Sequence, residues 1–150
     1  MEKRQGTNDI PTEGIAIEEG FYHIPQTPDQ KPVLIGSRCT TCGEVYFPSV
    51  PQCLKCYTET TQTYELQRVG KVYSSTVVYL APPLYQGKVP YAIGHVELDN
   101  GVLVPTRFTE VGDIPIPIGT EVELVLEKLG KNEEGKDIIV HAFRPTKALK

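Results

Sequence analysis

The chain lacks a long apolar run, a leader peptide and the common nucleotide-binding motifs. Its longest apolar run covers residues 77–81, whereas a helix that spans a membrane needs roughly 20 apolar residues. Residues 1–6 are polar, and no apolar stretch of a secretory leader follows them. We therefore expect a cytoplasmic protein without membrane contact, whose cysteines stay reduced.

Positive charge is also scarce. The 15 Lys and Arg residues are outnumbered by 19 Asp and Glu residues, so the formal net charge is −4. Proteins that bind the phosphate backbone of nucleic acids draw much of their affinity from Lys and Arg. The acidic balance therefore argues against a general nucleic-acid-binding protein.

Cysteine is rare but regularly spaced. The chain has four cysteines in two Cys-x-x-Cys pairs separated by ten residues: Cys39 with Cys42, and Cys53 with Cys56. Two such pairs suit one tetrahedral metal ion, and zinc is the usual occupant. Because no cysteine is left over, the four thiolates form a closed ligand set without an open position for substrate. We therefore predict a structural zinc ion rather than a catalytic one.

Other chemistries of these cysteines stay open from the sequence. Iron in a rubredoxin-like site is the main rival, because four thiolates also bind iron and neither softness nor geometry separates the two metals. A redox dithiol is disfavoured, since thioredoxin-type sites belong to a βαβ pattern that the chain lacks. Gly43 follows the first pair and allows a tight turn with positive φ, whereas Tyr57 follows the second pair.

Short runs of β-forming residues surround the cysteine pairs. We expect strands at residues 33–37 and 45–47. Each Cys-x-x-Cys pair forms a turn, called a knuckle below, and the order strand–knuckle–strand–knuckle is that of a zinc ribbon. A unit of this size is too small to fold without its metal, so metal binding and local folding should be coupled. Zinc-finger peptides gain on the order of 10–16 kcal/mol from this coupling.

Further along the chain, alternating apolar and polar residues indicate five strands. Val122 and Leu124, for example, face one way while Glu123 faces the other. Asn100 and Gly101 together predict a type I′ hairpin turn. Five strands within such a short segment predict a small closed barrel of the OB type. The expected strands are residues 71–80, 91–98, 102–108, 121–129 and 138–143.

These patterns predict a mostly β protein with four parts. They are an N-terminal arm at residues 1–32, a rubredoxin-like zinc ribbon at 33–66, a C-terminal five-stranded OB-fold barrel at 67–146 and a tail at 147–150. The arm is polar and either disordered or ordered by a partner. We favour a partner contact because the side chains of Ile10, Ile15, Ile17 and Phe21 give the arm enough apolar surface to dock.

Several short motifs follow one another in a fixed order. They are Arg38-Cys39-x-x-Cys42-Gly43, Phe47-Pro48, Cys53-x-x-Cys56, Gly70-Lys71-Val72, Pro82-Pro83, Pro90-Tyr91, Val96-Glu97-Leu98-Asp99-x-Gly101, Ile118-Gly119 and Phe143-Arg144-Pro145. This ordered set resembles the acyl-CoA-associated family of zinc-ribbon/OB-fold proteins over residues 33–146. Family members often have Pro-Pro-Arg before the third cysteine, whereas residues 48–52 read PSVPQ here. A role tied to that arginine does not carry over.

The resemblance implies a non-catalytic small subunit that assembles with a thiolase-type catalytic subunit, as a hetero-oligomer such as α2β2. The partner would carry the nucleophilic cysteine and the acid/base histidine. The small subunit would support assembly and share the binding of the coenzyme A (CoA) thioester. The cysteines agree with this reading independently, because a thiolase needs an activated thiol and all four thiols here are assigned to metal. The resemblance also implies a link to aromatic-compound degradation, although no residue here identifies an aromatic substrate.

Residues 82–91 form a loop that contains candidate CoA ligands. One hypothesis is that Lys88 meets a CoA phosphate and that Tyr85 or Tyr91 stacks on adenine, with Arg107 as a weaker candidate. We favour the competing interpretation, which is an ordinary strand connection with a solvated lysine.

The three histidines are candidate bases. For His23, His95 and His141 we favour the alternative of surface or hydrogen-bonded histidines.

Two other functions stay open from the sequence. In a different functional class, the chain would be a single-stranded nucleic-acid-binding module that stacks bases on its tyrosines. An iron-loaded electron carrier is a third alternative.

Overall fold

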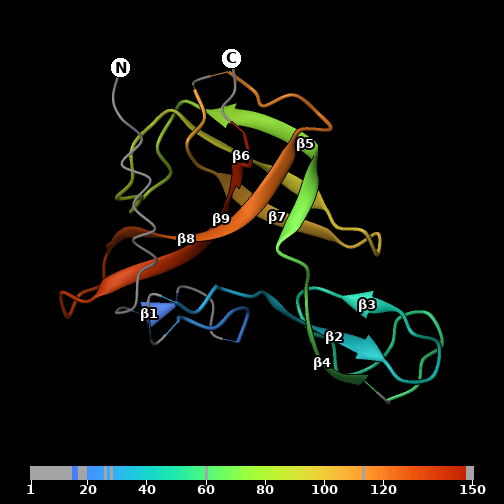
Figure 1. Cartoon of the computed structure of the whole chain (residues 1–150). Helices are drawn as coiled ribbons and strands as arrows, with labels where there is room; N and C mark the ends of the chain where they lie inside the picture. The colour runs from blue at the N-terminus through green and yellow to red at the C-terminus, as the bar shows by residue number, and fades with distance from the viewer. Residues whose placement is uncertain are drawn as a thin grey trace.

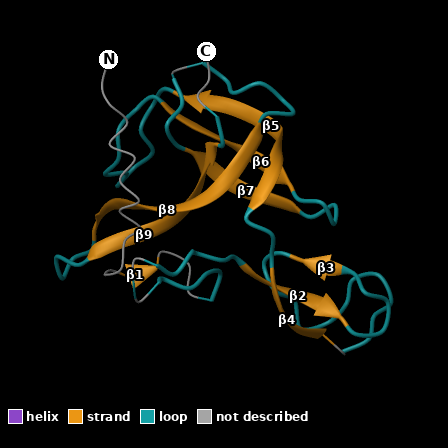
Figure 2. Ribbon diagram, in the orientation of Figure 1, coloured by secondary structure: helices purple, strands orange, loops and turns teal. Residues whose placement is uncertain are grey.

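The computed structural model describes residues 15–16, 20–25, 27, 29–59, 61–112 and 114–147. This part of the chain consists of strands, turns and loops, without a helix (Figure 2). None of the described residues therefore forms an apolar helix of membrane-spanning length. The strands make two sheets, a larger one in the second half of the chain and a smaller one before it.

The larger sheet is built from six strands. They are β1 (Ile15–Ala16), β5 (Val69–Val78), β6 (Tyr91–Glu97), β7 (Leu103–Phe108), β8 (Glu121–Lys131) and β9 (Asp137–Pro145). Their hydrogen-bonded order is β1-β9-β7-β6-β5-β8, and β8 also pairs with β9. Strands β5 to β9 therefore close into a barrel, with β1 added outside (Figure 1). The five expected barrel strands are confirmed, and their ends lie within two residues of the prediction.

The barrel core is formed by alternate residues of its strands. On β8, Val122 and Leu124 are buried as predicted, while Glu123 lies half-buried on the outer side. Phe143 of β9 is the largest fully buried side chain among the described residues. Burying such an apolar side chain contributes about 1.5–3 kcal/mol relative to leaving it exposed. The core is therefore a continuous apolar cluster, and none of the four cysteines belongs to it.

The hairpin between β6 and β7 differs from the prediction. The N–H of Leu98 donates to the carbonyl of Val102 at 3.0 Å, and the N–H of Gly101 donates to the carbonyl of Leu98 at 2.8 Å. Of the two predicted positive-φ residues only Gly101 has one, at 81°. The type I′ prediction was therefore wrong. The loop has three residues, with a left-handed glycine closing it, and the Asn100 side chain accepts the Val102 N–H at 3.3 Å.

The smaller sheet is the predicted ribbon. Its order is β3-β2-β4, formed by β2 (Ile35–Cys39), β3 (Val45–Tyr46) and β4 (Thr61–Glu65). The first two strands were expected, whereas β4 was not. Strand β4 pairs with β2 along its whole length. The ribbon therefore has three strands, and the chain passes from β4 directly into the barrel (Figure 1).

The ribbon and the barrel meet at an aromatic junction. The Tyr22 hydroxyl donates to the carbonyl of Ile139 on β9. The ring of His141 lies edge-on to Tyr22 at 5.8 Å and to Phe47 at 6.1 Å between centroids. Phe21, the last apolar residue proposed for a partner contact, packs against Phe47 at 5.3 Å. Two other residues of that proposal, Ile10 and Ile17, lie outside the described residues, as does the side chain of Ile15.

Candidate functional site

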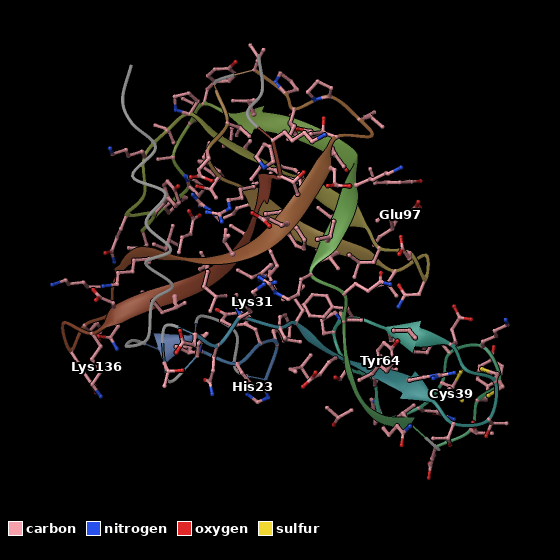
Figure 3. All side chains as sticks on the ribbon, in the orientation of Figure 1. His23, Lys31, Cys39, Tyr64, Glu97 and Lys136 are labelled. Atoms are coloured by element: carbon pink, nitrogen blue, oxygen red, sulfur yellow. The ribbon has the colours of Figure 1, made fainter. Side chains whose placement is uncertain are left out.

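The four cysteines converge at the end of the ribbon that lies away from the barrel (Figure 3). Their Sγ atoms all lie within 4.8 Å of one another. The Sγ atoms of Cys39 and Cys56 are 3.5 Å apart, as are those of Cys42 and Cys53. A tetrahedral zinc ion with Zn–S bonds of about 2.3 Å places its sulfurs about 3.8 Å apart. The cysteine cluster therefore has dimensions that fit one tetrahedral ion, and its sulfurs are too far apart for disulfide bonds.

The two knuckles have the same backbone turn. Gly43 has a φ of 81°, and its N–H donates to the carbonyl of Cys39 at 2.9 Å. In the second knuckle Tyr57 has a φ of 62°, and its N–H donates to the carbonyl of Cys53 at 3.0 Å. Tyr57 thus occupies the left-handed position that glycine fills in the first knuckle. Its residue type gave no signal of this conformation.

Hydrogen bonds favour the thiolate at the first cysteine of each knuckle. The Thr58 hydroxyl, followed by the Cys42 N–H, lowers the pKa of Cys39 to about 5. The Tyr46 hydroxyl lowers the pKa of Cys53 to about 7. Since a metal ion binds the thiolate and not the thiol, both residues are prepared for ligation.

Cys42 differs from these two ligands. The backbone N–H of Glu44 favours its thiolate, but desolvation and hydrogen bonds with the other cysteines raise the pKa of Cys42 to about 12 in the metal-free ribbon. Cys42 is exposed and Cys56 half-buried, whereas Cys39 and Cys53 are buried. With all four sulfurs as ligands, an ion here would crosslink the two knuckles and would leave no position for a reacting molecule.

The barrel face brings three of the four candidate CoA ligands together. The rings of Tyr85 and Tyr91 lie 4.8 Å apart, and the Arg107 guanidinium lies 4.9 Å from the Tyr91 ring centroid. Arg107 also donates to the Tyr85 hydroxyl at 3.0 Å and to Glu127 at 3.1 Å. Its charge is therefore already balanced by Glu127. Lys88 is exposed, and its carbonyl accepts the Tyr85 hydroxyl at 3.2 Å.

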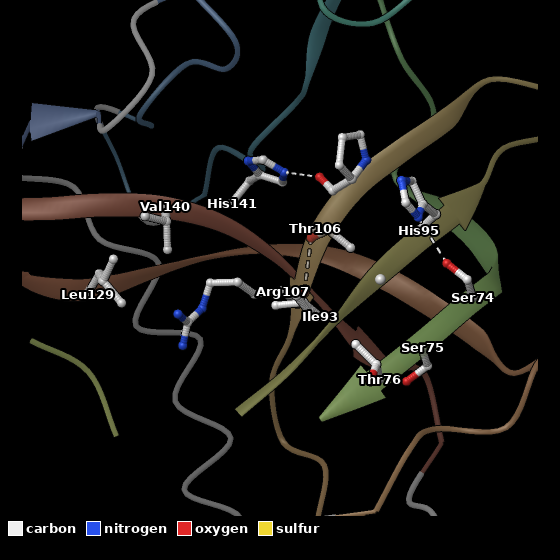
Figure 4. A pocket seen from close by; sticks show the side chains of 12 residues that line it. Ser74, Ser75, Thr76, Ile93, His95, Thr106, Arg107, Leu129, Val140 and His141 are labelled. Atoms are coloured by element: carbon white, nitrogen blue, oxygen red, sulfur yellow. Dashed lines mark hydrogen bonds between the residues drawn. The ribbon is translucent and has the colours of Figure 1, made fainter. Parts of the chain in front are cut away.

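Two hollows meet beside this cluster. A polar pocket of about 520 Å³ is lined by Lys88, Arg107, Lys128 and Glu110, among others. A more apolar groove of about 590 Å³ crosses the outside of the barrel and is shown in Figure 4. Arg107 and Leu129 line both. The face can therefore accommodate a ligand with a polar end and an extended apolar part.

Two of the candidate histidines border the apolar groove (Figure 4). His95 is exposed on β6, and its Nδ1 lies 2.9 Å from the Ser74 hydroxyl. On β9, the Nε2 of His141 donates to the Pro105 carbonyl at 2.8 Å. These contacts agree with the interpretation of hydrogen-bonded strand histidines. His23 is exposed in the segment before the ribbon.

Two family models match the two halves of this architecture. Residues 29–61 match the rubredoxin-like zinc ribbon domain of ChsH2, and residues 63–127 match the C-terminal OB-fold domain of ChsH2. A DUF35 domain-containing scaffold protein of Methanocaldococcus jannaschii is 35% identical over 116 residues, which are 75% of this chain and 81% of that protein. The chain belongs to the DUF35 family of zinc-ribbon/OB-fold proteins.

The chain is also similar to proteins that are named as parts of enzymes. The benzoylsuccinyl-CoA thiolase subunit BbsA of Thauera aromatica is 30% identical over 115 residues, 75% of this chain and 76% of that protein. The solved structure of an Ltp2-ChsH2(DUF35) aldolase matches with a TM-score of 0.63 and 29% identity, over 77% of this chain and 86% of that one. The resemblance drawn from the motifs is therefore confirmed.

Gln52 lies directly before the third cysteine, and its side chain donates to the carbonyl of Tyr57 at 2.7 Å. This contact ties the start of the second knuckle to its end. The residue at this position thus contributes to the local structure of the ribbon.

Proposed function

We propose that the chain is the non-catalytic subunit of a heteromeric acyl-CoA thiolase or related acyltransferase. It supports assembly, as in an α2β2 complex, and helps to bind the CoA thioester. The partner supplies the nucleophilic cysteine and the acid/base histidine. The observation that carries this proposal is the convergence of all four thiols in one cluster. A thiolase-type reaction needs an uncommitted thiol, so the nucleophile belongs to another chain.

We place the CoA contact on the barrel face beside Tyr85, Lys88, Tyr91 and Arg107. A CoA thioester has an anionic nucleotide end and a long, less polar arm, which suit a polar pocket that joins an apolar groove. Because Arg107 is already paired with Glu127, Lys88 is the residue we assign to a phosphate. The zinc ion has a structural role in the ribbon, and the complex works in the cytoplasm.

Purification of the tagged full chain from its host tests the assembly. A thiolase-like protein recovered in near-equal amount, with acyl-CoA activity that depends on both chains, is the expected result. A chain that purifies alone and leaves acyl-CoA turnover unchanged would contradict the proposal. In that case, salt-sensitive binding of single-stranded oligonucleotides would support the nucleic-acid-binding alternative.

The CoA contact has its own test in the assembled complex. Lys88→Ala should raise the KM for the acyl-CoA by up to about fivefold with kcat unchanged, because an exposed ion pair contributes up to about 1 kcal/mol. Lys71→Ala is the matched control, since Lys71 is also exposed but lies on β5. Equal KM values in the two variants would remove Lys88 from the site without affecting the assembly proposal.

A further inference from the structure

Two hydroxyl groups lie next to the cysteine sulfurs. The Tyr46 hydroxyl is 3.3 Å from the Sγ of Cys53. It also accepts the N–H of Leu54 at 3.1 Å. This second contact fixes the oxygen beside the knuckle, so that the tyrosine proton is available to the sulfur. Tyr46 belongs to β3, which precedes the second knuckle.

Thr58 has a similar position at the other side of the cluster. Its hydroxyl lies 3.1 Å from the Sγ of Cys56 and 3.5 Å from that of Cys39. A metal-bound thiolate carries no proton, so the hydroxyl must be the donor in either contact. The hydroxyl therefore lies between two thiolates and is nearer to that of Cys56, so its single proton serves Cys56 at the shorter distance and Cys39 at the longer one.

These contacts matter because of the charge of the centre. Four thiolates around one divalent ion leave an excess of negative charge on the sulfurs. Donors to sulfur spread that charge and orient the ligand. Backbone N–H groups of Lys55 and Cys56 already donate to Cys53 at 3.4 and 3.5 Å, and the Cys42 N–H donates to Cys39 at 3.5 Å. The two hydroxyls add donors that come from side chains and can be removed by substitution.

We propose that Tyr46 and Thr58 are positioning residues of the metal centre, whose hydroxyl groups hold the thiolates of Cys53 and Cys56 and slow the loss of the ion. Neither residue is a ligand. This role depends on the ribbon alone and stands whether or not the chain assembles with a thiolase.

The test compares zinc release from the full chain in which single hydroxyl groups have been removed. Thr58→Val keeps the side-chain shape and removes little besides the donor. Tyr46→Phe keeps the ring and removes the donor to Cys53 together with the acceptor of the Leu54 N–H. Transfer of zinc to an excess of a chromophoric chelator gives the release rate. Loss of a hydrogen-bonding partner of a metal ligand typically weakens metal affinity about 10- to 100-fold, and we expect release to accelerate within that range. Tyr64→Phe is the control, because Tyr64 lies on β4 of the same sheet.

A second readout separates positioning from packing. In the cobalt-loaded chain, loss of a donor to sulfur should move the sulfur-to-cobalt charge-transfer band to longer wavelength. Thr58→Ser restores the hydroxyl and should restore both the band and the slow release. Wild-type release and spectra in Tyr46→Phe and Thr58→Val would overturn the proposal. So would a Thr58→Ser variant that behaves like Thr58→Val, because the lost methyl group would then be the cause.

Discussion

The ribbon and the barrel are stabilised in different ways, although they belong to one short chain. Between residues 38 and 61, the buried residues that the structure describes are Cys39 and Cys53. In the barrel, buried apolar residues come from every strand. The outer part of the ribbon therefore depends on its metal ion, whereas the barrel depends on apolar burial.

This difference in stabilisation suits the ribbon and the barrel to different roles. The metal crosslink fixes two exposed knuckles at a place where the sequence offers almost no core. The barrel needs no such crosslink, so its outer face remains available for the polar pocket and the apolar groove. This chain thus combines a metal-held ribbon with a barrel that presents a surface.

Removing one ligand should have the largest effect. Cys53→Ser takes away a buried thiolate that also accepts the Tyr46 hydroxyl. We expect loss of most of the bound zinc and of the ribbon's fold, because metal coupling in zinc-finger peptides is on the order of 10–16 kcal/mol. Metal analysis and thermal unfolding check this prediction. Full zinc content with unchanged melting would contradict the assignment of the site.

Truncating a buried side chain of the barrel tests the same comparison in the other part of the chain. Phe143→Ala should destabilise the barrel by about 3–5 kcal/mol, the usual cost of truncating a buried aromatic residue, while the zinc content stays at one ion per chain. Denaturant unfolding with metal analysis measures both. Leu84→Ala is the control, since Leu84 is 98% exposed, and it should change stability by less than about 0.5 kcal/mol. Zinc loss in Phe143→Ala would show that the two parts are not separable.

Substitutions at the left-handed residues of the two knuckles should change the stability of the ribbon by a smaller amount. Gly43→Ala should destabilise the ribbon by about 1–2 kcal/mol, because an L side chain is strained in the left-handed region. The strain is conformational, since the nearest atom to an added Cβ is the Arg38 side chain at 3.7 Å. Tyr57→Gly should have the opposite sign and a magnitude of at most about 1 kcal/mol. Resistance of the zinc-loaded ribbon to proteolysis reports both, and effects of the same sign would refute the shared turn geometry.

The sequence predicted those features whose cause is local. The cysteine spacing gave the metal cluster, and alternating residues such as those around Val122 gave the barrel strands. Strand β4 was missed because the sequence TQTYE is short and polar, and it is a strand through its pairing with β2. The contact between Arg107 and Glu127 could also not be predicted from the sequence, because closure of the barrel brings together residues that are 20 positions apart. The conformation of Tyr57 is set by the knuckle rather than by its residue type.

The most direct test of this account is amide hydrogen exchange of the full chain before and after zinc is removed by a chelator. We expect protection to be lost across residues 38–61 and to persist in β5 to β9. Protection that persists in the ribbon without metal, or that disappears from the barrel together with the ribbon, would contradict the division between a metal-held ribbon and a core-held barrel.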